Sequence, residues 1–304
     1  MSKTRVLMEQ LQVMHFSHKI IRVSVIFTIQ DAILVISQYD MILFMKTKNS
    51  YIQQHSITIN DKITTCHIQN NVLIVGTLTS ALLLYRILID QFQLLHSTKV
   101  DTSSINSICF DEGLNSYFIA SHSLFKLEFS ENYKVCKQNI INTSIFTKIK
   151  PSQNSLVLVK QQINANSIIS LISPTTYDSI NIQTYSVHSR SIQSIYCDKS
   201  NNYLITGDTQ GMIVFWDLAN EKQEIIFTRL LGGKIVSSQL DTEALILYVA
   251  NQIGMVVVID CQRNVILKSM FAHEAGLAGS LLTKDQYFTW DKHGIVKCWQ
   301  ITLK

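Results

Sequence analysis

The chain has little proline, little glycine and little charge. Its 304 residues include 2 prolines and 10 glycines. Charged residues make up 16% of the sequence, against about 25% in an average soluble domain. Low charge combined with 47% hydrophobic residues argues against intrinsic disorder. Because glycine and proline are scarce, Asn, Gln, Ser, Asp and Lys must form most of the turns.

The sequence also lacks the cysteine patterns of metal sites. Its six cysteines, at positions 66, 109, 136, 197, 261 and 298, are widely spaced, with no Cys-x-x-Cys pair and no Cys/His cluster. We therefore expect no metal and no cofactor. Cys66 and Cys197 lie where the repeat described below requires buried apolar residues. Reduced core thiols in an intracellular protein, cytoplasmic or nuclear, are the prediction.

No run of 18 apolar residues, the length of a membrane-spanning helix, is present. Residues 20–37 are the most apolar stretch, but Arg22 and the Gln30-Asp31 pair interrupt them. Two buried strands joined by a turn at Gln30-Asp31 explain this stretch better. The N-terminus has no apolar core of a signal peptide. We expect no membrane insertion.

Positive charge is in slight excess. The net charge of +4 is far below that of a nucleic-acid-binding arm, so nucleic acid is a partner that the charge permits without indicating. From Asn132 to Tyr177 there are five lysines and no acidic residue. A solvated rim is favoured there over a specific anion site.

A repeat runs through the chain. Each of its clearest copies has an apolar strand, a small turn and a second strand that ends in a bulky residue, and four copies align without gaps at 73–86, 204–217, 247–260 and 287–300. Three weaker copies lie at 34–46, 117–129 and 156–172. Short β-branched runs precede and follow most copies, and no helix of ten or more residues is indicated. The sequence therefore predicts an all-β protein with seven units of four antiparallel strands.

Two units carry a further pattern. The fifth has His188, Thr206, Gly211 and Trp216-Asp217, and the seventh has a matching set at His273, Thr289, Gly294 and Trp299. With this pattern the chain resembles the WD-repeat family, whose fold is a seven-bladed β-propeller. The resemblance covers nearly the whole chain. It implies one domain, 1–304, with blades at about 20–59, 60–99, 100–140, 141–186, 187–230, 231–271 and 272–304 plus 4–14.

The resemblance also predicts how the ring closes. The last unit ends at Lys304, directly after its third strand, so its fourth strand must come from elsewhere. Residues 4–14 precede the first unit and are available. We expect them to pair with residues 294–302, because this pairing removes two exposed sheet edges.

In the WD-repeat family, a His, a Ser or Thr, an Asp and a Trp of one blade form a hydrogen-bonded tetrad. The resemblance therefore implies structural rather than catalytic or metal-binding roles for His188, Thr206, Trp216, His273, Thr289 and Trp299. The family's Asp position holds Gln210 in one unit and His293 in the other, which leaves the charge-assisted network incomplete. Asp208 and Asp291, two residues earlier, are the alternative acids. In the other blades, apolar packing is expected to replace the tetrad.

Partners of the family often dock on one face of the ring, the top face, which carries the loops between second and third strands and between blades. Loops on a rigid scaffold are also general binding sites. Candidates on that face include Lys19, Lys62, His122 and Lys160, and the set that we expect to bind a partner is Arg190, Lys234, Trp290, Lys292 and His293. Trp290 replaces a small residue of other repeats and is either an exposed anchor for an acidic or aromatic partner or packed onto its own turn.

No catalytic motif, such as Gly-x-Ser-x-Gly or His-Glu-x-x-His, is present, and we expect no enzyme activity and no catalytic residue. The favoured function is a scaffold that mediates protein–protein interactions within an intracellular complex. The alternative is an accessory subunit of an RNA- or other nucleic-acid-processing or -modifying complex.

Overall fold

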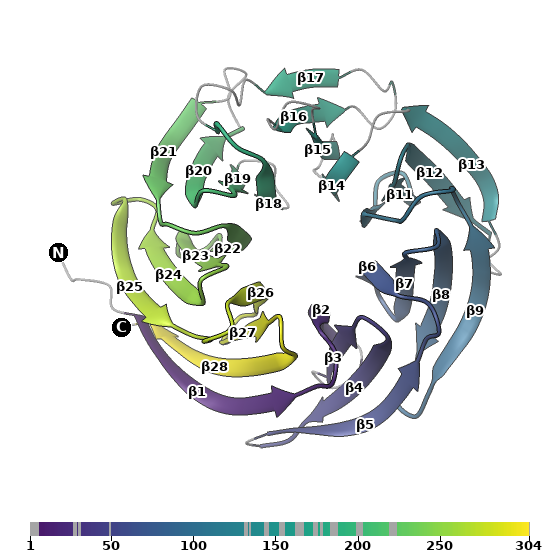
Figure 1. Cartoon of the computed structure of the whole chain (residues 1–304), viewed down its shortest axis with the longest axis horizontal. Coiled ribbons are helices and arrows are strands. Elements are labelled where there is room, and N and C mark those ends of the chain that lie inside the picture. Colours follow the sequence, from purple (N-terminus) through teal and green to yellow (C-terminus); the bar gives the residue numbers. More distant parts are fainter. Residues whose placement is uncertain are drawn as a thin grey trace.

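Four-stranded antiparallel sheets form a ring, the architecture of a β-propeller (Figure 1). The structure is a computed structural model. It describes residues 6–26, 29, 32–48, 50–130, 133, 135–142, 146–151, 156–161, 167–172, 176, 179–182, 188–198, 203–218 and 224–303. Strands are the regular elements of this described part, as the β-branched runs and polar turns predict.

The described strands group into seven sheets, numbered here as blades 1 to 7 in chain order. Blade 1 comprises β2 (Ile20–Ile26), β3 (Ala32–Ser37), β4 (Asp40–Lys46) and β5 (Tyr51–Thr58). Blade 2 comprises β6 (Ile63–Gln69), β7 (Val72–Thr77), β8 (Ala81–Ile87) and β9 (Phe92–Lys99). Blade 3 comprises β10 (Ser107–Asp111), β11 (Ser116–Ala120), β12 (Leu124–Phe129) and β13 (Val135–Asn142). Blade 4 comprises β14 (Phe146–Pro151), β15 (Leu156–Gln161), β16 (Ser167–Ile172) and β17 (Ser179–Ile182).

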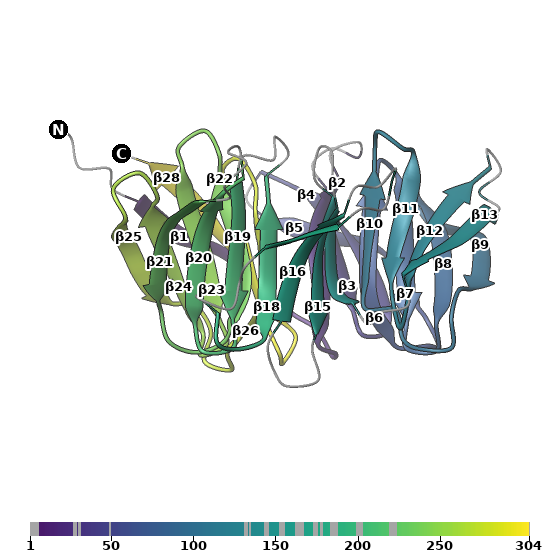
Figure 2. The ribbon, with the colours of Figure 1, turned by 90° about the horizontal axis from the view of Figure 1, so that it is seen from above.

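Blade 5 comprises β18 (Ile192–Cys197), β19 (Tyr203–Asp208), β20 (Met212–Asp217) and β21 (Glu224–Leu230). Blade 6 comprises β22 (Ile235–Asp241), β23 (Ile246–Asn251), β24 (Met255–Asp260) and β25 (Val265–Phe271). Blade 7 comprises β26 (Leu277–Leu282), β27 (Gln286–Asp291), β28 (Ile295–Leu303) and the N-terminal strand β1 (Val6–His15). In each blade the first strand lies nearest the centre of the ring (Figure 1). Successive strands run in opposite directions, so the two sets of loops lie on opposite faces (Figure 2).

Strand β1 closes the ring. It pairs antiparallel with β28 from Val6 opposite Leu303 to His15 opposite Ile295, which is the pairing that the missing fourth strand predicts. A side chain of β1 also reaches the next blade. The Gln12 amide donates to the Tyr51 carbonyl over 3.2 Å and accepts the Tyr51 N–H over 2.7 Å. These two hydrogen bonds link the closing strand β1 to blade 1.

The hydrophobic core is divided among the interfaces between neighbouring blades. Ile63 and Leu73 of blade 2, for example, pack in one cluster with Leu34 and Met41 of blade 1. Ile235 and Leu247 belong in the same way to a cluster shared by blades 5 and 6. Since a buried Leu or Ile contributes about 1.5–3 kcal/mol, each interface stabilises the ring.

Hydroxyl groups around the channel add polar links between blades. The Ser194 hydroxyl lies 3.0 Å from that of Ser238 in the next blade, and both side chains are buried. Thr64 donates to the carbonyl of Ile105 in the next blade. Adjacent innermost strands approach closely enough there for a short side chain to bridge them.

Residues 20–26 and 32–37 form two strands, as predicted for the most apolar stretch of the chain. The predicted turn at Gln30-Asp31 lies outside the described residues, as do Lys134 and the side chains of the other four lysines of the basic stretch 132–177. Among the described residues, no helix is long and apolar enough to cross a bilayer.

Candidate functional site

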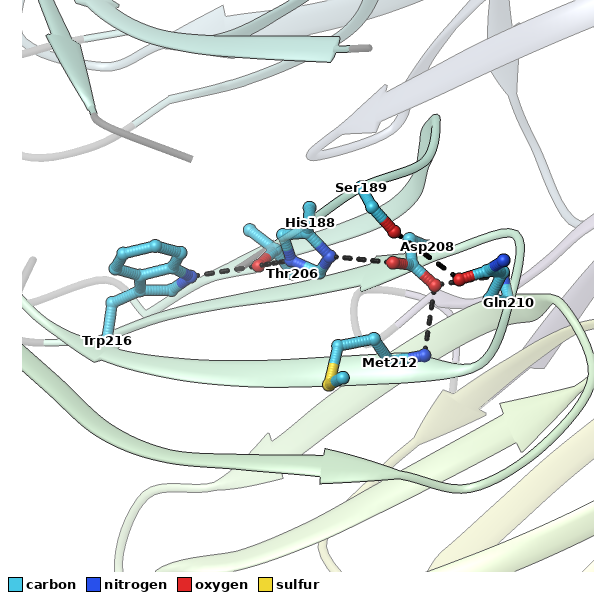
Figure 3. A network of polar contacts seen from close by, with 7 residues as sticks. All are labelled: His188, Ser189, Thr206, Asp208, Gln210, Met212 and Trp216. Atoms are coloured by element: carbon cyan, nitrogen blue, oxygen red, sulfur yellow. Dashed lines mark hydrogen bonds and ion pairs between the residues drawn. The ribbon is translucent and has the colours of Figure 1, made fainter. Parts of the chain in front are cut away.

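The His188 side chain is the centre of a buried network in blade 5 (Figure 3). Its Nδ1 lies 3.0 Å from Asp208 Oδ2, and its Nε2 lies 2.7 Å from Thr206 Oγ1. Trp216 Nε1 donates to the same Thr206 oxygen over 2.8 Å. One tautomer satisfies every group: Nδ1–H donates to the carboxylate, and Nε2 accepts the threonine proton.

Blade 7 repeats this network. His273 Nδ1 lies 3.1 Å from Asp291 Oδ2, and its Nε2 lies 2.9 Å from Thr289 Oγ1. Trp299 Nε1 donates to Thr289 Oγ1 over 2.8 Å. The structure therefore brings together each His–Thr–Trp set that the resemblance implies.

The acids of both networks are Asp208 and Asp291, the alternatives that the sequence offered, and not Gln210 and His293 at the family's Asp position. Gln210 is exposed, and its backbone N–H donates to Asp208 Oδ1 over 2.9 Å. Met212 N–H donates to the same oxygen. Burial opposes ionisation of Asp208, but the hydrogen bonds from His188 and these two amides outweigh it and hold the pKa below its ordinary value.

Other blades keep one part of this arrangement, the hydrogen bond from a backbone N–H to the side chain that ends the second strand. The last residue of the second strand is Thr77 in blade 2 and Asn251 in blade 6, and each accepts a backbone N–H of the following turn at 2.9–3.0 Å. In blade 1, Ser37 does the same for Asp40. A short polar side chain at this repeated position was the sequence signal that identifies Asp208 and Asp291 as the acids.

The order Thr–His–Asp is also that of a hydrolytic triad, but burial gives it a structural role. Thr206 is 0% exposed and His188 is 1% exposed. A substrate has no route to the threonine oxygen, which already accepts the Trp216 proton. Burial lowers the pKa of His273 against the opposing effect of Asp291, so this imidazole is neutral at pH 7. The networks hold the turns of the top face in place.

Lysines surround the channel on that face. Lys19, Lys62 and Lys234 occupy equivalent positions just before the first strands of blades 1, 2 and 6. The carbonyl of each accepts an N–H from its own blade's second-to-third-strand turn, over 2.7–3.0 Å. Lys292 lies in the corresponding turn of blade 7, which is between blades 6 and 1.

Three of these lysines are electrostatically coupled, and we call Lys19, Lys234 and Lys292 the lysine rim. Lys234 is half-buried, whereas Lys19 and Lys292 are exposed. Burial lowers the pKa of Lys234, and the charges of Lys292 and Lys19 lower it further. Within the described chain, none of the three forms an ion pair with a carboxylate. The result is a local concentration of positive charge without direct carboxylate partners among the described residues.

Trp290 does not belong to an exposed binding surface, which corrects one of the two alternatives for it. The side chain is only 5% exposed and packs with Phe288 and Val296 in the cluster between blades 7 and 1. Its ring lies against Gly279, where any Cβ would overlap it. Trp290 is therefore packed within its own blade, and Gly279 makes room for it.

Arg190 and His293 are both exposed. His293 neighbours Lys292 in the turn of blade 7, and Arg190 precedes the first strand of blade 5, next to the blade of Lys234. Partner binding by Arg190, Lys234, Lys292 and His293 stays a prediction, and the proximity of Lys19 to Lys234 and Lys292 depends on the curvature of the ring.

Metal-ligating side chains do not gather in the described part of the chain, where no three His, Cys, Asp or Glu residues are close enough together to hold an ion. Buried Cys66 has its pKa raised to about 11 by burial, against a smaller lowering by Arg22, so its thiol is neutral and unreactive.

Comparison with known proteins adds no assignment to this geometry. No family model matches the chain, and no curated protein matches it at a significant level.

Proposed function

We propose that this protein is a non-catalytic scaffold of the WD-repeat type that binds another protein of an intracellular complex, in the cytoplasm or nucleus, through its top face. The observation that carries the proposal is the lysine rim, where three like charges from blades 6, 7 and 1 meet without carboxylate partners among the described residues. The repeat pattern and the two histidine networks support the family assignment. The buried free thiols support a reducing compartment.

The rim favours an acidic partner. Gathering three positive charges and partly burying Lys234 is unfavourable in the free protein, and carboxylates of a partner relieve that repulsion on binding. The charge also steers an acidic surface towards the channel mouth before contact.

A charge-matched pair of variants tests the proposal. The triple variant Lys19→Glu, Lys234→Glu, Lys292→Glu changes the net charge by three times −2, from +4 to −2. The control Lys46→Glu, Lys99→Glu, Lys284→Glu makes the same change at exposed lysines away from the rim. Quantitative affinity purification should lose the stoichiometric partner only with the rim variant. Equal recovery with both variants would refute the role of the rim.

A nucleic-acid-associated subunit is the second candidate, since the lysine rim also suits phosphates. Filter binding of RNA across a salt titration distinguishes the two. Contact with about three phosphates predicts a slope of log K against log salt near −2 for a single strand. A rim-dependent slope of that size supports the second candidate, and its absence supports the first.

A further inference from the structure

A groove of about 520 Å³ lies on the bottom face, opposite the lysine rim, between blades 2 and 3. One wall is the turn between the first two strands of blade 2, including Asn70, together with Arg86 on β8. The other wall comes from blade 3 and includes Asn115 and Tyr117.

Aromatic side chains form the blade 3 wall. The rings of Phe110 and Tyr117 are 4.6 Å apart, and those of Tyr117 and Phe129 are 5.4 Å apart with planes at 79°. All three side chains are half-buried, as is Tyr133 at the same groove. Half-buried rings in a concave surface leave apolar area for a ligand to cover.

Arg86 supplies a positive charge in the same groove. Its guanidinium lies over the Tyr133 ring, 5.6 Å from the centroid. The side chain is half-buried, and no carboxylate of the described chain forms an ion pair with it. A planar guanidinium fixed on a ring still directs its N–H donors sideways, where a carboxylate fits.

Polar side chains at the groove also suit hydrogen bonding to a peptide. Burial and, to a lesser extent, nearby Tyr133 raise the pKa of Tyr117 to about 12, so its hydroxyl remains a donor. Asn70 and Asn115 are exposed at the two walls, each in a turn with positive φ. Their amides are placed to hydrogen-bond the backbone of an extended segment.

We propose that this groove binds a short extended peptide of a partner protein in which an Asp or Glu lies next to a large apolar side chain. The carboxylate pairs with Arg86, and the apolar side chain packs among Phe110, Tyr117 and Phe129. A nucleobase fits less well, because the rings are tilted or edge-to-face and one face of Tyr133 is covered by Arg86. The inference rests on the proposed scaffold function and adds a second docking surface to it.

Selection from a random 12-residue peptide library displayed on phage tests the proposal, with the wild-type protein as bait and Arg86→Glu as counter-selection. We expect enriched peptides to carry Asp or Glu beside Leu, Ile or Phe. A synthetic enriched peptide should bind Arg86→Glu at least tenfold more weakly than wild type. Arg263→Glu, an equal charge change at an exposed residue of blade 6, should bind as wild type does.

A double-mutant comparison separates contact from misfolding. Replacing the peptide's acid by its amide should weaken binding to wild type about tenfold but leave binding to Arg86→Gln unchanged. Thermal melting verifies that both Arg86 variants are folded. Enriched peptides without an acid, no enrichment, or equal loss with Arg86→Gln would each overturn the proposal.

The proposed peptide binding by the groove and the proposed partner binding by the top face can be refuted independently of each other. The lysine-rim variant should bind the selected peptide like wild type, because the rim lies on the opposite face. Loss of the cellular partner with the rim variant, together with retained peptide binding, would therefore separate the two docking surfaces.

Discussion

At the scale of single residues, the top face depends on the polar side chain that ends each second strand. Asp208 bonds His188 with one oxygen and caps its turn with the other. The sequence spacing found His188, Thr206 and Trp216, because these lie at fixed places in the repeat. It offered Asp208 only as the alternative to the motif position at Gln210, because matching residue types to a motif does not show which side chain the turn brings back to the imidazole.

Asp208→Ala and Gln210→Ala distinguish the two assignments of the acid. Removing Asp208 leaves the buried His188 Nδ1–H and two turn amides without their acceptor, which should lower the free energy of unfolding by about 2–4 kcal/mol. Removing the exposed Gln210 should change it by less than about 0.5 kcal/mol. Urea unfolding followed by tryptophan fluorescence measures both, and a larger loss for Gln210→Ala would contradict the network.

The neutral His273 makes stability depend on pH. Its folded pKa lies below the unfolded value near 6.5, so the unfolded chain takes up the proton first on acidification. Its contribution is complete above pH 6.5 and is lost as the pH falls below that value. The urea midpoint should therefore drop between pH 7.5 and 5.5. His273→Gln should be less stable at both values but show a smaller drop, whereas an equal drop would refute this origin.

At the scale of elements, the ring is closed by a strand from the opposite end of the chain. The sequence predicts this pairing because the last repeat ends after three strands. It does not predict the two hydrogen bonds between the Gln12 side chain and the Tyr51 backbone. The reason is that β1 shifts register between Gln10 and Gln12, and that irregularity decides which side chains face blade 1. A repeat pattern specifies which strands pair, whereas the details of closure depend on local geometry.

Gln12→Ala tests the link between β1 and blade 1, with Gln10→Ala as its control. The Gln12 amide makes two hydrogen bonds to the Tyr51 backbone, and their loss should lower stability by about 1–3 kcal/mol. Gln10 is exposed on the same strand, and its removal should have little effect. Thermal melting by circular dichroism compares the two.

Deleting residues 1–15 removes the whole closing strand, exposes the edge of β28 and should lower the melting temperature far more than Gln12→Ala does. Unchanged melting after the deletion would contradict closure by β1.

At the scale of the whole molecule, seven similar units of strands give a ring, and the ring brings distant residues together. Lys19 and Lys292 are far apart in sequence but meet Lys234 because blade 7 contains both ends of the chain. The repeat spacing predicts the strands and their order. The gathered charges, the hydroxyl links around the channel and the groove between blades 2 and 3 depend on how blades pack. Residue patterns within one repeat do not encode that packing.

The central claim is that this ring is a scaffold whose top face holds an acidic protein partner. The most direct measurement is the mass and composition of the endogenous protein after gentle purification at low salt, repeated at about 1 M salt, where charges are screened beyond about 3 Å. We predict a fixed ratio of this chain to a second polypeptide at low salt, and weaker association at high salt. A protein that migrates at the mass of one chain, 34.6 kDa, under both conditions would contradict the claim.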